Sequence, residues 1–224
     1  MLPPDANSPG RYSLVWVRGV DCEGCTIAAL GDPSAGGFEG LFGAPREGLS
    51  TIDLIHPLFA LETGEAFMDR MRSCARGLLG PYALLVESAV TELIPGAPGW
   101  FESLGEEDHQ PMSIGTWLDR LAPGADFVAA VGDCAVWGGP HSIAGNPTQS
   151  TGVSMWLGSD YRSRLGAPVI NLPGCAVQAG VLATVADLVA WACGRGRAPE
   201  LDEHNRPRLA YGAVWKGALA LWET

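Results

Sequence analysis

Basic residues and long apolar runs are both scarce in this sequence. The 224 residues contain 14 Lys and Arg against 25 Asp and Glu, which gives a formal net charge of −11. Because no run is rich in Lys or Arg, this balance argues against binding to nucleic acid. No stretch of about 20 uninterrupted apolar residues is present, so no direct membrane span is expected.

Signals for export and for common nucleotide sites are also missing. The opening residues, MLPPDANSPGRYS, lack a basic segment followed by an apolar one, so we expect a cytoplasmic protein. No P-loop, Rossmann glycine fingerprint or Ser-His-Asp order is present, so no dinucleotide or flavin site is expected in this chain. In the cytoplasm a Cys-x-x-Cys pair is typical of metal binding or redox chemistry rather than of a structural disulfide.

The composition that remains is that of a globular protein with a sizeable core. Hydrophobic residues make up 47% of the chain and charged residues 17%. The length suits one domain with an extension. We expect a flexible N-terminus over 1–10, a main domain over 11–197 and a short, irregular C-terminal extension over 198–224.

Short apolar runs alternate with helical stretches along the chain. Five runs lack strict alternation and therefore predict buried parallel strands, at 13–19, 51–56, 82–88, 126–132 and 168–174. Helices are predicted at 63–79, at 113–121 with Ser113 as N-cap, and at 176–193. In the first helix the predicted buried face contains Phe67, Met71, Cys74 and Leu78. The remaining segments 89–112 and 138–152 are predicted loops, and the whole pattern indicates an α/β, doubly wound, mostly parallel sheet.

Four of the six cysteines directly follow predicted strands. They are Cys22, Cys25, Cys134 and Cys175. Because the carboxyl ends of parallel strands meet at one edge of a sheet, we expect these four thiols to form a single site. Four thiolates are the ligands of a tetrahedral zinc ion or of an iron–sulfur cluster. The other two cysteines, Cys74 and Cys193, lie on apolar helix faces, where core packing is the expected role.

The residues around these cysteines favour a cluster over zinc. Structural zinc sites usually pair two Cys-x-x-Cys turns, and this chain has only one. A redox pair made of Cys22 and Cys25 alone would leave the other two cysteines without a role. Cys25 and Cys175 are expected to open helices, whose positive ends favour thiolate. Glycines that let the backbone approach an inorganic core flank the site, namely Gly24, Gly132, Gly138, Gly139 and Gly174.

Taken together, the motifs resemble those of the small subunit of nickel–iron hydrogenases. The resemblance covers most of the chain and depends on WVRGVDCEGC, LVES, GDCAVWGG with NPTQSTG, PVINLPGC and LDEHNRPRLAYG. It implies a flavodoxin-like domain in which Cys22, Cys25, Cys134 and Cys175 bind one proximal [4Fe-4S] cluster. The chain would carry electrons and contain no catalytic residue of its own.

The resemblance also implies roles for residues beside the cluster. Glu87, and less clearly Asp21, would lie next to the cluster or at the subunit interface, with Gly24, Gly132 and Gly174 around it. Where oxygen-tolerant relatives add cysteines, this chain has Glu23 or Gly24, and Gly139, so a six-cysteine cluster is not expected. The usual PGCP is PGCAVQAG here, which alters one wall of the cluster site but keeps the ligand. No cysteine follows Cys193, so we expect no further cluster in this chain.

Two partners follow from the same resemblance. A large subunit would hold the nickel–iron centre, and a further electron-relay subunit would exchange electrons with the proximal cluster. One alternative is the cluster-bearing subunit of a complex I-like quinone oxidoreductase, although such proteins typically have adjacent cysteines where this chain has Cys22 and Cys25. Another is a zinc-bearing structural scaffold.

Three further side chains leave their roles open at this point. His56, before Pro57 at a predicted strand end, either faces the cluster or a partner or is a hydrogen-bonded structural residue. His141, in the loop after Gly139, has the same two interpretations. Glu87 is either functional or a turn cap.

Overall fold

The main sheet has five parallel strands in the order expected for a flavodoxin-like domain. The computed structural model describes the chain except for residues 1–10, 44–50, 60–63, 92–101, 146 and 213–224. The strands are β1 (Arg11–Val17), β2 (Thr51–Ile55), β3 (Tyr82–Val86), β6 (Val128–Val131) and β7 (Ile170–Leu172). They are arranged as β2-β1-β3-β6-β7 and pair in parallel throughout. The α/β, doubly wound prediction is therefore confirmed. From β1 the chain adds β2 on one side and β3, β6 and β7 on the other, so the strand order changes direction between β1 and β3.

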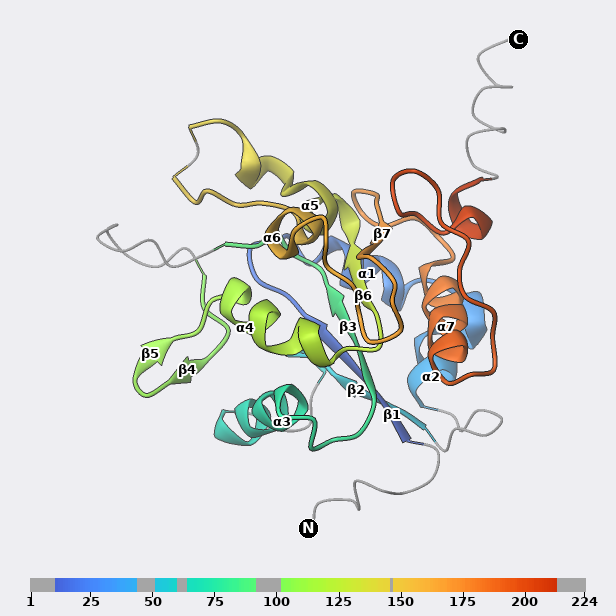
Figure 1. The fold of residues 1–224 in the computed structure, drawn as a ribbon, viewed down its shortest axis with the longest axis horizontal. Coiled ribbons are helices and arrows are strands. Elements are labelled where there is room, and N and C mark those ends of the chain that lie inside the picture. Colours follow the sequence, from blue (N-terminus) through green and yellow to red (C-terminus); the bar gives the residue numbers. More distant parts are fainter. Residues whose placement is uncertain (1–10, 44–50, 60–63, 92–101, 146, 213–224) are drawn as a thin grey trace.

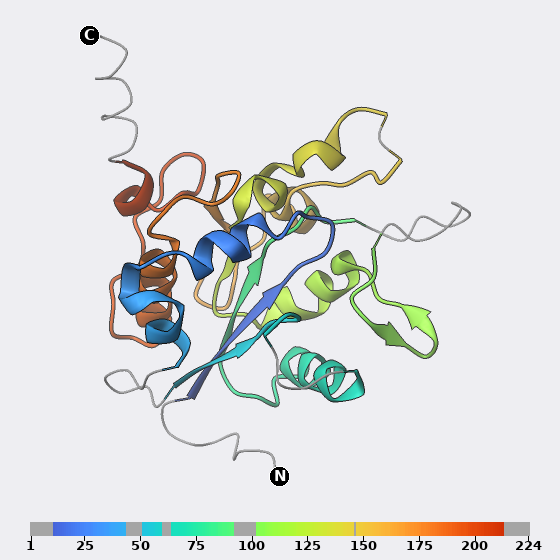
Figure 2. The ribbon, with the colours of Figure 1, turned by 180° about the vertical axis from the view of Figure 1, so that it is seen from behind.

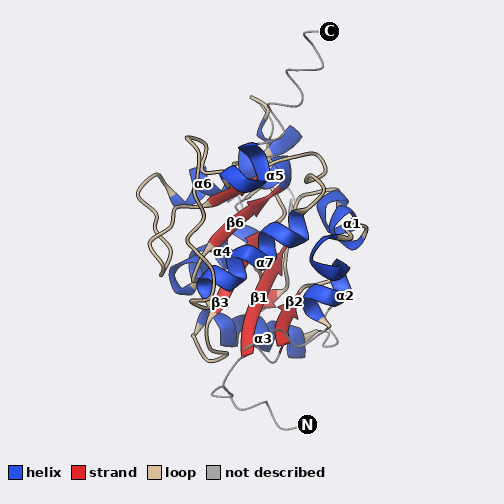
Figure 3. Ribbon diagram, turned by 90° about the vertical axis from the view of Figure 1, so that its right-hand side faces the viewer, coloured by secondary structure: helices blue, strands red, loops and turns tan. Residues whose placement is uncertain are grey.

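Helices cover both faces of this sheet (Figures 1 and 3). On one face α3 (Glu65–Ala75) and α4 (Ile114–Leu121) pack against β1 residues such as Val15 and Val17. On the other face α1 (Gly24–Leu30), α2 (Gly37–Phe42) and α7 (Val181–Ala192) pack with Leu14 and Trp16. Successive strand residues point to opposite faces. Since both faces are buried, the strands are apolar without alternation.

Short elements complete the described chain. A two-stranded hairpin joins β4 (Glu106–Glu107) to β5 (Gln110–Pro111), inside the segment predicted as a loop. The remaining elements are α5 (Gly132–Trp137), α6 (Val153–Leu157) and the 3-10 turns η1 (Ser34–Gly36), η2 (Ala122–Gly124) and η3 (Gly139–Ser142).

Two of the predicted helices are shorter than their apolar spacing indicated: one ends earlier and the other begins later. The helix predicted over 63–79 ends at Ala75, so Leu78 lies beyond it with 57% of its surface exposed rather than buried. The helix predicted over 176–193 begins only at Val181, because Gly180 is left-handed with a φ of 87°. By contrast, α4 confirms its prediction, and the Ser113 hydroxyl accepts the Thr116 N–H at 3.0 Å.

The described part of the C-terminal extension packs beside β7. The Asn171 backbone N–H donates to the Asn205 carbonyl at 2.9 Å, and the Asn171 side chain donates to the His204 carbonyl at 2.8 Å. Tyr211 donates its hydroxyl to the Pro173 carbonyl at 3.1 Å, close to Cys175. The N-terminal prediction for 1–10 lies outside the described residues, and the boundary at 197 stays a prediction. Among the described helices, none has the length and apolar character needed to span a bilayer.

Candidate metal centre

All four predicted ligands lie at the carboxyl end of the parallel sheet. Cys22 and Cys25 follow β1, and Cys25 lies in the first turn of α1. Cys134 lies in α5, directly after β6, and Cys175 lies in the turn after β7. Figure 2 shows α1 and α5 at the same end of the sheet. The structure thus brings strand ends that are far apart in the sequence to one edge.

Hydrogen bonds connect the loops that carry these cysteines. The Val177 N–H, two residues after Cys175, donates to Cys25 Sγ at 3.3 Å. Asp133 donates its backbone N–H to the Gly174 carbonyl at 3.0 Å, and Gly174 donates its own N–H to Asp133 Oδ1 at 2.8 Å. Each bond joins a residue on or beside one cysteine to the loop of another, so the three loops are held as one unit.

Glycine is required where the backbone passes next to the sulfurs. Gly132 has a φ of 85°, and a Cβ there would overlap Cys25 Sγ. A Cβ on Gly24 would be 3.2 Å from Cys22 Sγ, and one on Gly139 would be 2.8 Å from Cys134 Sγ. This close approach of backbone to thiol is the cradle that a compact inorganic group needs. Gly174, with a φ of 137°, serves the turn instead, since a Cβ there would be 2.7 Å from the Ala176 carbonyl oxygen.

The surroundings of the thiols differ from what helix ends alone predicted. Burial raises the pKa of Cys25 to about 12; the Val177 N–H opposes this increase, and the nearby Glu87, Cys134 and Cys22 add to it. Cys175 does not open a helix, because α7 begins at Val181 and the Cys175–Ala176 peptide bond, in cis, lies within a turn. The prediction of two helix-opening thiolates is therefore wrong for Cys175, whereas Cys25 does lie in the first turn of α1.

The pKa of Cys134 is affected by two of the other thiols. Burial raises its pKa, and negative charge on Cys22 and Cys175 raises it further, which requires that these sulfurs lie near one another. Cys22 and Cys175 are exposed, whereas Cys25 and Cys134 are half-buried. The centre is therefore open toward one side of the sheet edge.

Glu87 lies under the cysteine loop at the end of β3 and is 2% exposed. Its Oε1 accepts the Thr26 backbone N–H at 2.8 Å, and its Oε2 accepts the Trp16 indole N–H at 3.1 Å as well as the Thr26 hydroxyl. Burial raises the pKa of this carboxyl, while the bonds from Thr26 oppose the increase. The side chain contacts the residue that follows Cys25, which supports its predicted place beside the site.

Asp21 shapes the turn between the first two cysteines. Its Oδ1 accepts the Glu23 N–H at 2.7 Å and the Arg18 guanidinium at 2.7 Å. Arg18 also pairs with the Glu23 carboxylate at 3.1 Å. Glu23 has a left-handed φ of 62°, which is unusual for a residue with a side chain. These bonds hold the strained residue between Cys22 and Cys25.

The donor set and the cradle fit an iron–sulfur cluster. Soft thiolates from several loops, with glycine backbone against the sulfurs, are what a [4Fe-4S] cluster requires. Among the residues that the structure describes, no three His, Cys, Asp or Glu side chains are grouped closely enough for one metal ion. Cys74 is buried in the core as predicted, and Cys193 is partly buried against the core on the other face.

Sequence reasoning missed Thr26 and left the role of His56 open. Thr26 carries no signal beyond following a predicted ligand, yet it joins Glu87 to His56. His56 had two open interpretations; it is fully buried and its Nε2 lies 3.2 Å from the Thr26 hydroxyl. The structure favours the hydrogen-bonded one, but places it next to the ligand loop. His141 lies in η3, where its carbonyl accepts the Thr148 hydroxyl at 3.0 Å.

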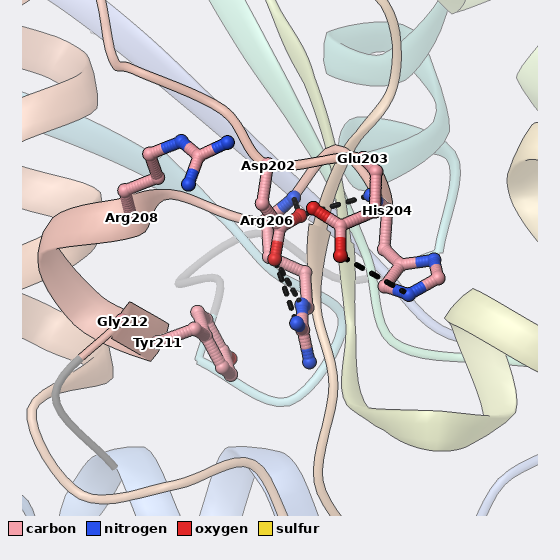
Figure 4. A pocket seen from close by; sticks show the side chains of 7 residues that line it. All are labelled: Asp202, Glu203, His204, Arg206, Arg208, Tyr211 and Gly212. Carbon is pink, nitrogen blue, oxygen red and sulfur yellow. Dashed lines mark hydrogen bonds and ion pairs between the residues drawn. The ribbon is translucent and has the colours of Figure 1, made fainter. Parts of the chain in front are cut away.

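A separate polar pocket lies in the C-terminal extension (Figure 4). Its volume is about 340 Å³, and its lining includes Asp202, His204, Arg206 and Tyr211. Arg206 pairs with Asp202 at 2.7 Å. None of the four cysteines lines this pocket, so the metal centre is a site of its own.

One family model matches most of the chain. Residues 47–188 match the family described as NADH ubiquinone oxidoreductase, 20 Kd subunit. This range includes Cys134 and Cys175 and begins after Cys22 and Cys25.

Relatives of known function match nearly the whole chain. The Hydrogenase-2 small chain of Escherichia coli (strain K12) is 28% identical over 215 residues, which are 95% of this chain and 51% of the relative. The periplasmic [NiFeSe] hydrogenase small subunit of Desulfomicrobium baculatum is 29% identical over 217 residues, covering 90% of this chain and 63% of the relative.

Solved structures share the fold. A chain of the actinobacterial-type NiFe-hydrogenase from Ralstonia eutropha H16 superimposes with a TM-score of 0.82 and 31% identity, covering 93% of this chain and 63% of that one. The [NiFeSe] hydrogenase from Desulfovibrio vulgaris Hildenborough gives a TM-score of 0.72 at 27% identity, covering 91% and 70%. The chain therefore spans between 51% and 70% of the length of these relatives.

Proposed function

We propose that this chain, which belongs to the family of the NADH ubiquinone oxidoreductase 20 Kd subunit, is the electron-transfer small subunit of a nickel–iron hydrogenase, because its relatives of known function are hydrogenase small subunits. The similar proteins confirm the resemblance to hydrogenase small subunits that the cysteine motifs suggested. One observation carries the proposal: three interlocked loops gather Cys22, Cys25, Cys134 and Cys175 at one sheet edge.

In this proposal the four cysteines hold one proximal [4Fe-4S] cluster. When bound, the cluster supplies one-electron transfer, at a potential that hydrogen bonds, burial and charge adjust. The residues of the chain provide those conditions. Gly132 and Gly24 let the backbone lie against the sulfurs, the Val177 N–H donates to Cys25 Sγ, and the buried carboxylate of Glu87 adds negative charge nearby.

Apolar side chains beside the cysteines support a partner over this edge. Ile27, shortly after Cys25, is 63% exposed, and Trp137, shortly after Cys134, is 54% exposed. Exposed apolar residues grouped at a site are typical of a protein interface. We assign this edge to the large subunit, which would hold the nickel–iron centre, and expect a further electron-relay subunit elsewhere on the chain.

Anaerobic purification of the complex from its host tests the proposal. About four irons and four sulfides per copy of the chain, broad absorption near about 400 nm and co-purification with a large subunit are expected. The same preparation should reduce a viologen dye with hydrogen. Zinc alone would support the scaffold alternative, and an active isolated monomer would exclude the proposed partners.

A second candidate is a subunit of a complex I-like quinone oxidoreductase, favoured by the name of the matching family. The spacing of Cys22 and Cys25 favours the hydrogenase. A large subunit with paired Cys-x-x-Cys motifs near both ends would identify the hydrogenase, whereas quinone reduction without hydrogen uptake would identify the alternative.

The location of the complex is the last part of the proposal. We propose the cytoplasm, in contrast to the Desulfomicrobium baculatum relative, which is named periplasmic. Separation of periplasmic and cytoplasmic fractions of the host, followed by detection of the chain, decides between the two.

A further inference from the structure

A buried chain of hydrogen bonds leads from the end of β2 to the residue beside Cys25. The Leu58 N–H donates to His56 Nδ1 at 3.1 Å, so the ring proton of the neutral imidazole is on Nε2. Nε2 lies 3.2 Å from the Thr26 hydroxyl and therefore donates to it. The hydroxyl proton of Thr26 then points to Glu87 Oε2. In this series of hydrogen bonds, the neighbour of each group determines whether that group donates or accepts.

Thr26 is anchored to Glu87 twice, through its backbone and through its side chain. Its N–H is in the first turn of α1, where backbone donors have no partner within the helix. No side chain at the N-cap position of α1 accepts these donors, and the Thr26 N–H donates to Glu87 Oε1 instead. The carboxylate of a neighbouring strand thus replaces the local cap and fixes the residue next to Cys25.

We propose that Thr26 and His56 are positioning residues that hold Cys25 in its ligand geometry and thereby set the properties of the cluster. The inference rests on the proposed function for its spectroscopic part. The two residues act through Cys25: His56 orients the Thr26 hydroxyl, and the hydroxyl and N–H of Thr26 hold the start of α1 on Glu87.

The chain offers a matched control in a second threonine–glutamate pair. The Thr91 hydroxyl donates to Glu102 Oε1 at 2.8 Å, and the same oxygen accepts the Ile114 N–H at 2.7 Å at the start of α4. Thr91 is 1% exposed and Thr26 is 2% exposed, so the two residues are similarly buried. Neither Thr91 nor Ile114 adjoins a cysteine.

Three variants separate the positioning role from general stability. Thr26→Val removes the hydroxyl and keeps the shape, Thr26→Ser keeps the hydroxyl, and Thr91→Val removes the control hydroxyl. In the purified complex, iron content, the electron paramagnetic resonance spectrum of the reduced cluster and its reduction potential are measured. In the full chain without metal, hydrogen exchange of the peptide that spans residues 22–30 is measured.

Thr26→Val should change the resonance spectrum and shift the potential, and should exchange residues 22–30 about tenfold faster. Thr26→Ser and Thr91→Val should match the unaltered protein in all three, and His56→Phe should resemble Thr26→Val. Unchanged spectrum, potential and exchange in Thr26→Val would overturn the inference, as would equal changes in Thr91→Val.

The exchange measurement keeps this test independent of the proposed function. If the unaltered complex holds no iron, the proposed function fails. The exchange rates of the metal-free variants then still decide whether Thr26 and His56 hold the Cys25 loop.

Discussion

Glu87, which is buried, and Glu102, which is half-buried, each accept a backbone N–H at the start of a helix, and the two differ in how many of their carboxylate oxygens accept hydrogen bonds. Glu87 accepts hydrogen bonds at both carboxylate oxygens, from Trp16 and twice from Thr26. Glu102 accepts two bonds at Oε1, while its buried Oε2 has no partner in the described part of the chain. Burial raises the pKa of both. The carboxylate that accepts hydrogen bonds at both oxygens is that of Glu87, beside the proposed ligand Cys25. This indicates that the Cys25 loop requires the more rigid support.

The largest effect is expected when each carboxylate is deleted. Glu87→Ala leaves three buried donors without an acceptor, so the free energy of unfolding should fall by about 3–5 kcal/mol. Glu102→Ala leaves two donors without an acceptor, and a fall of about 1–3 kcal/mol is expected. Denaturant unfolding of the full chain measures both, and equal losses would remove the distinction between the two sites.

A smaller but more local effect is expected from a methyl group inside the cradle. Gly132→Ala places a Cβ against Cys25 Sγ at a left-handed φ, and should cost about 2–4 kcal/mol and most of the bound iron. Gly145→Ala is the control, since Gly145 has a φ of 83° and nothing within 4 Å of its added Cβ. Iron analysis and thermal unfolding compare them. Full iron occupancy in Gly132→Ala would show that the cradle is not needed.

Replacement by glutamine should lower the free energy of unfolding at Glu87 but not at Glu102. Either orientation of the amide in Glu87→Gln points an N–H₂ group at a donor, so a loss of about 1–3 kcal/mol is expected. In Glu102→Gln the amide nitrogen can take the place of Oε2, which accepts no hydrogen bond in the described part of the chain, so little change or a gain below about 1 kcal/mol is expected. The denaturant midpoints of the two variants measure this difference, and equal midpoint shifts would contradict the prediction.

The pH dependence of stability should show the smallest effect, through His56. Burial, and then Arg18, lowers the pKa of His56 from 6.5 to about 4, so the unfolded chain binds this proton more readily. Stability from this residue is therefore lost as pH falls below 6.5, by about 1 kcal/mol between about pH 7 and pH 5.5.

The difference in stability between the unaltered chain and His56→Gln isolates this contribution, because Glu87 and Glu102 titrate in both proteins. A difference that does not vary with pH would show that His56 is not held neutral by the fold.

Most of the fold followed from apolar runs, because a sheet covered on both faces leaves a continuous signal. The runs at 82–88 and 126–132 contain β3 and β6. Short elements carry too few residues for a periodic signal, which is why α2, α6 and the β4–β5 hairpin were not predicted. Because of Gly180 and the turn after Cys175, α7 begins later than predicted. The apolar spacing was misleading there, since Val177 packs on the core from a turn rather than from a helix.

The cysteines of the site were predictable, and their support was not. Strand ends locate Cys22, Cys134 and Cys175 because parallel strands share one carboxyl edge. Glu87 could be found as a charged residue after an apolar run. Thr26 and His56 could not be assigned, since their contact joins β2 to α1 across the fold. Glu102 carried no signal either, because its burial depends on Thr91 and Ile114.

The place of Cys175 at the edge strand also has a consequence for biosynthesis. Among the strands that the structure describes, β7 pairs only with β6 and is the last strand of the sheet along the chain. A ribosome that has made the chain only as far as the end of α5 has released three of the four thiols and none of the contacts from Gly174 and Val177. The fourth thiol arrives with the final strand, so completion of the sheet acts as a checkpoint. Under the proposed function, insertion of the cluster must wait until nearly the whole domain has been synthesised.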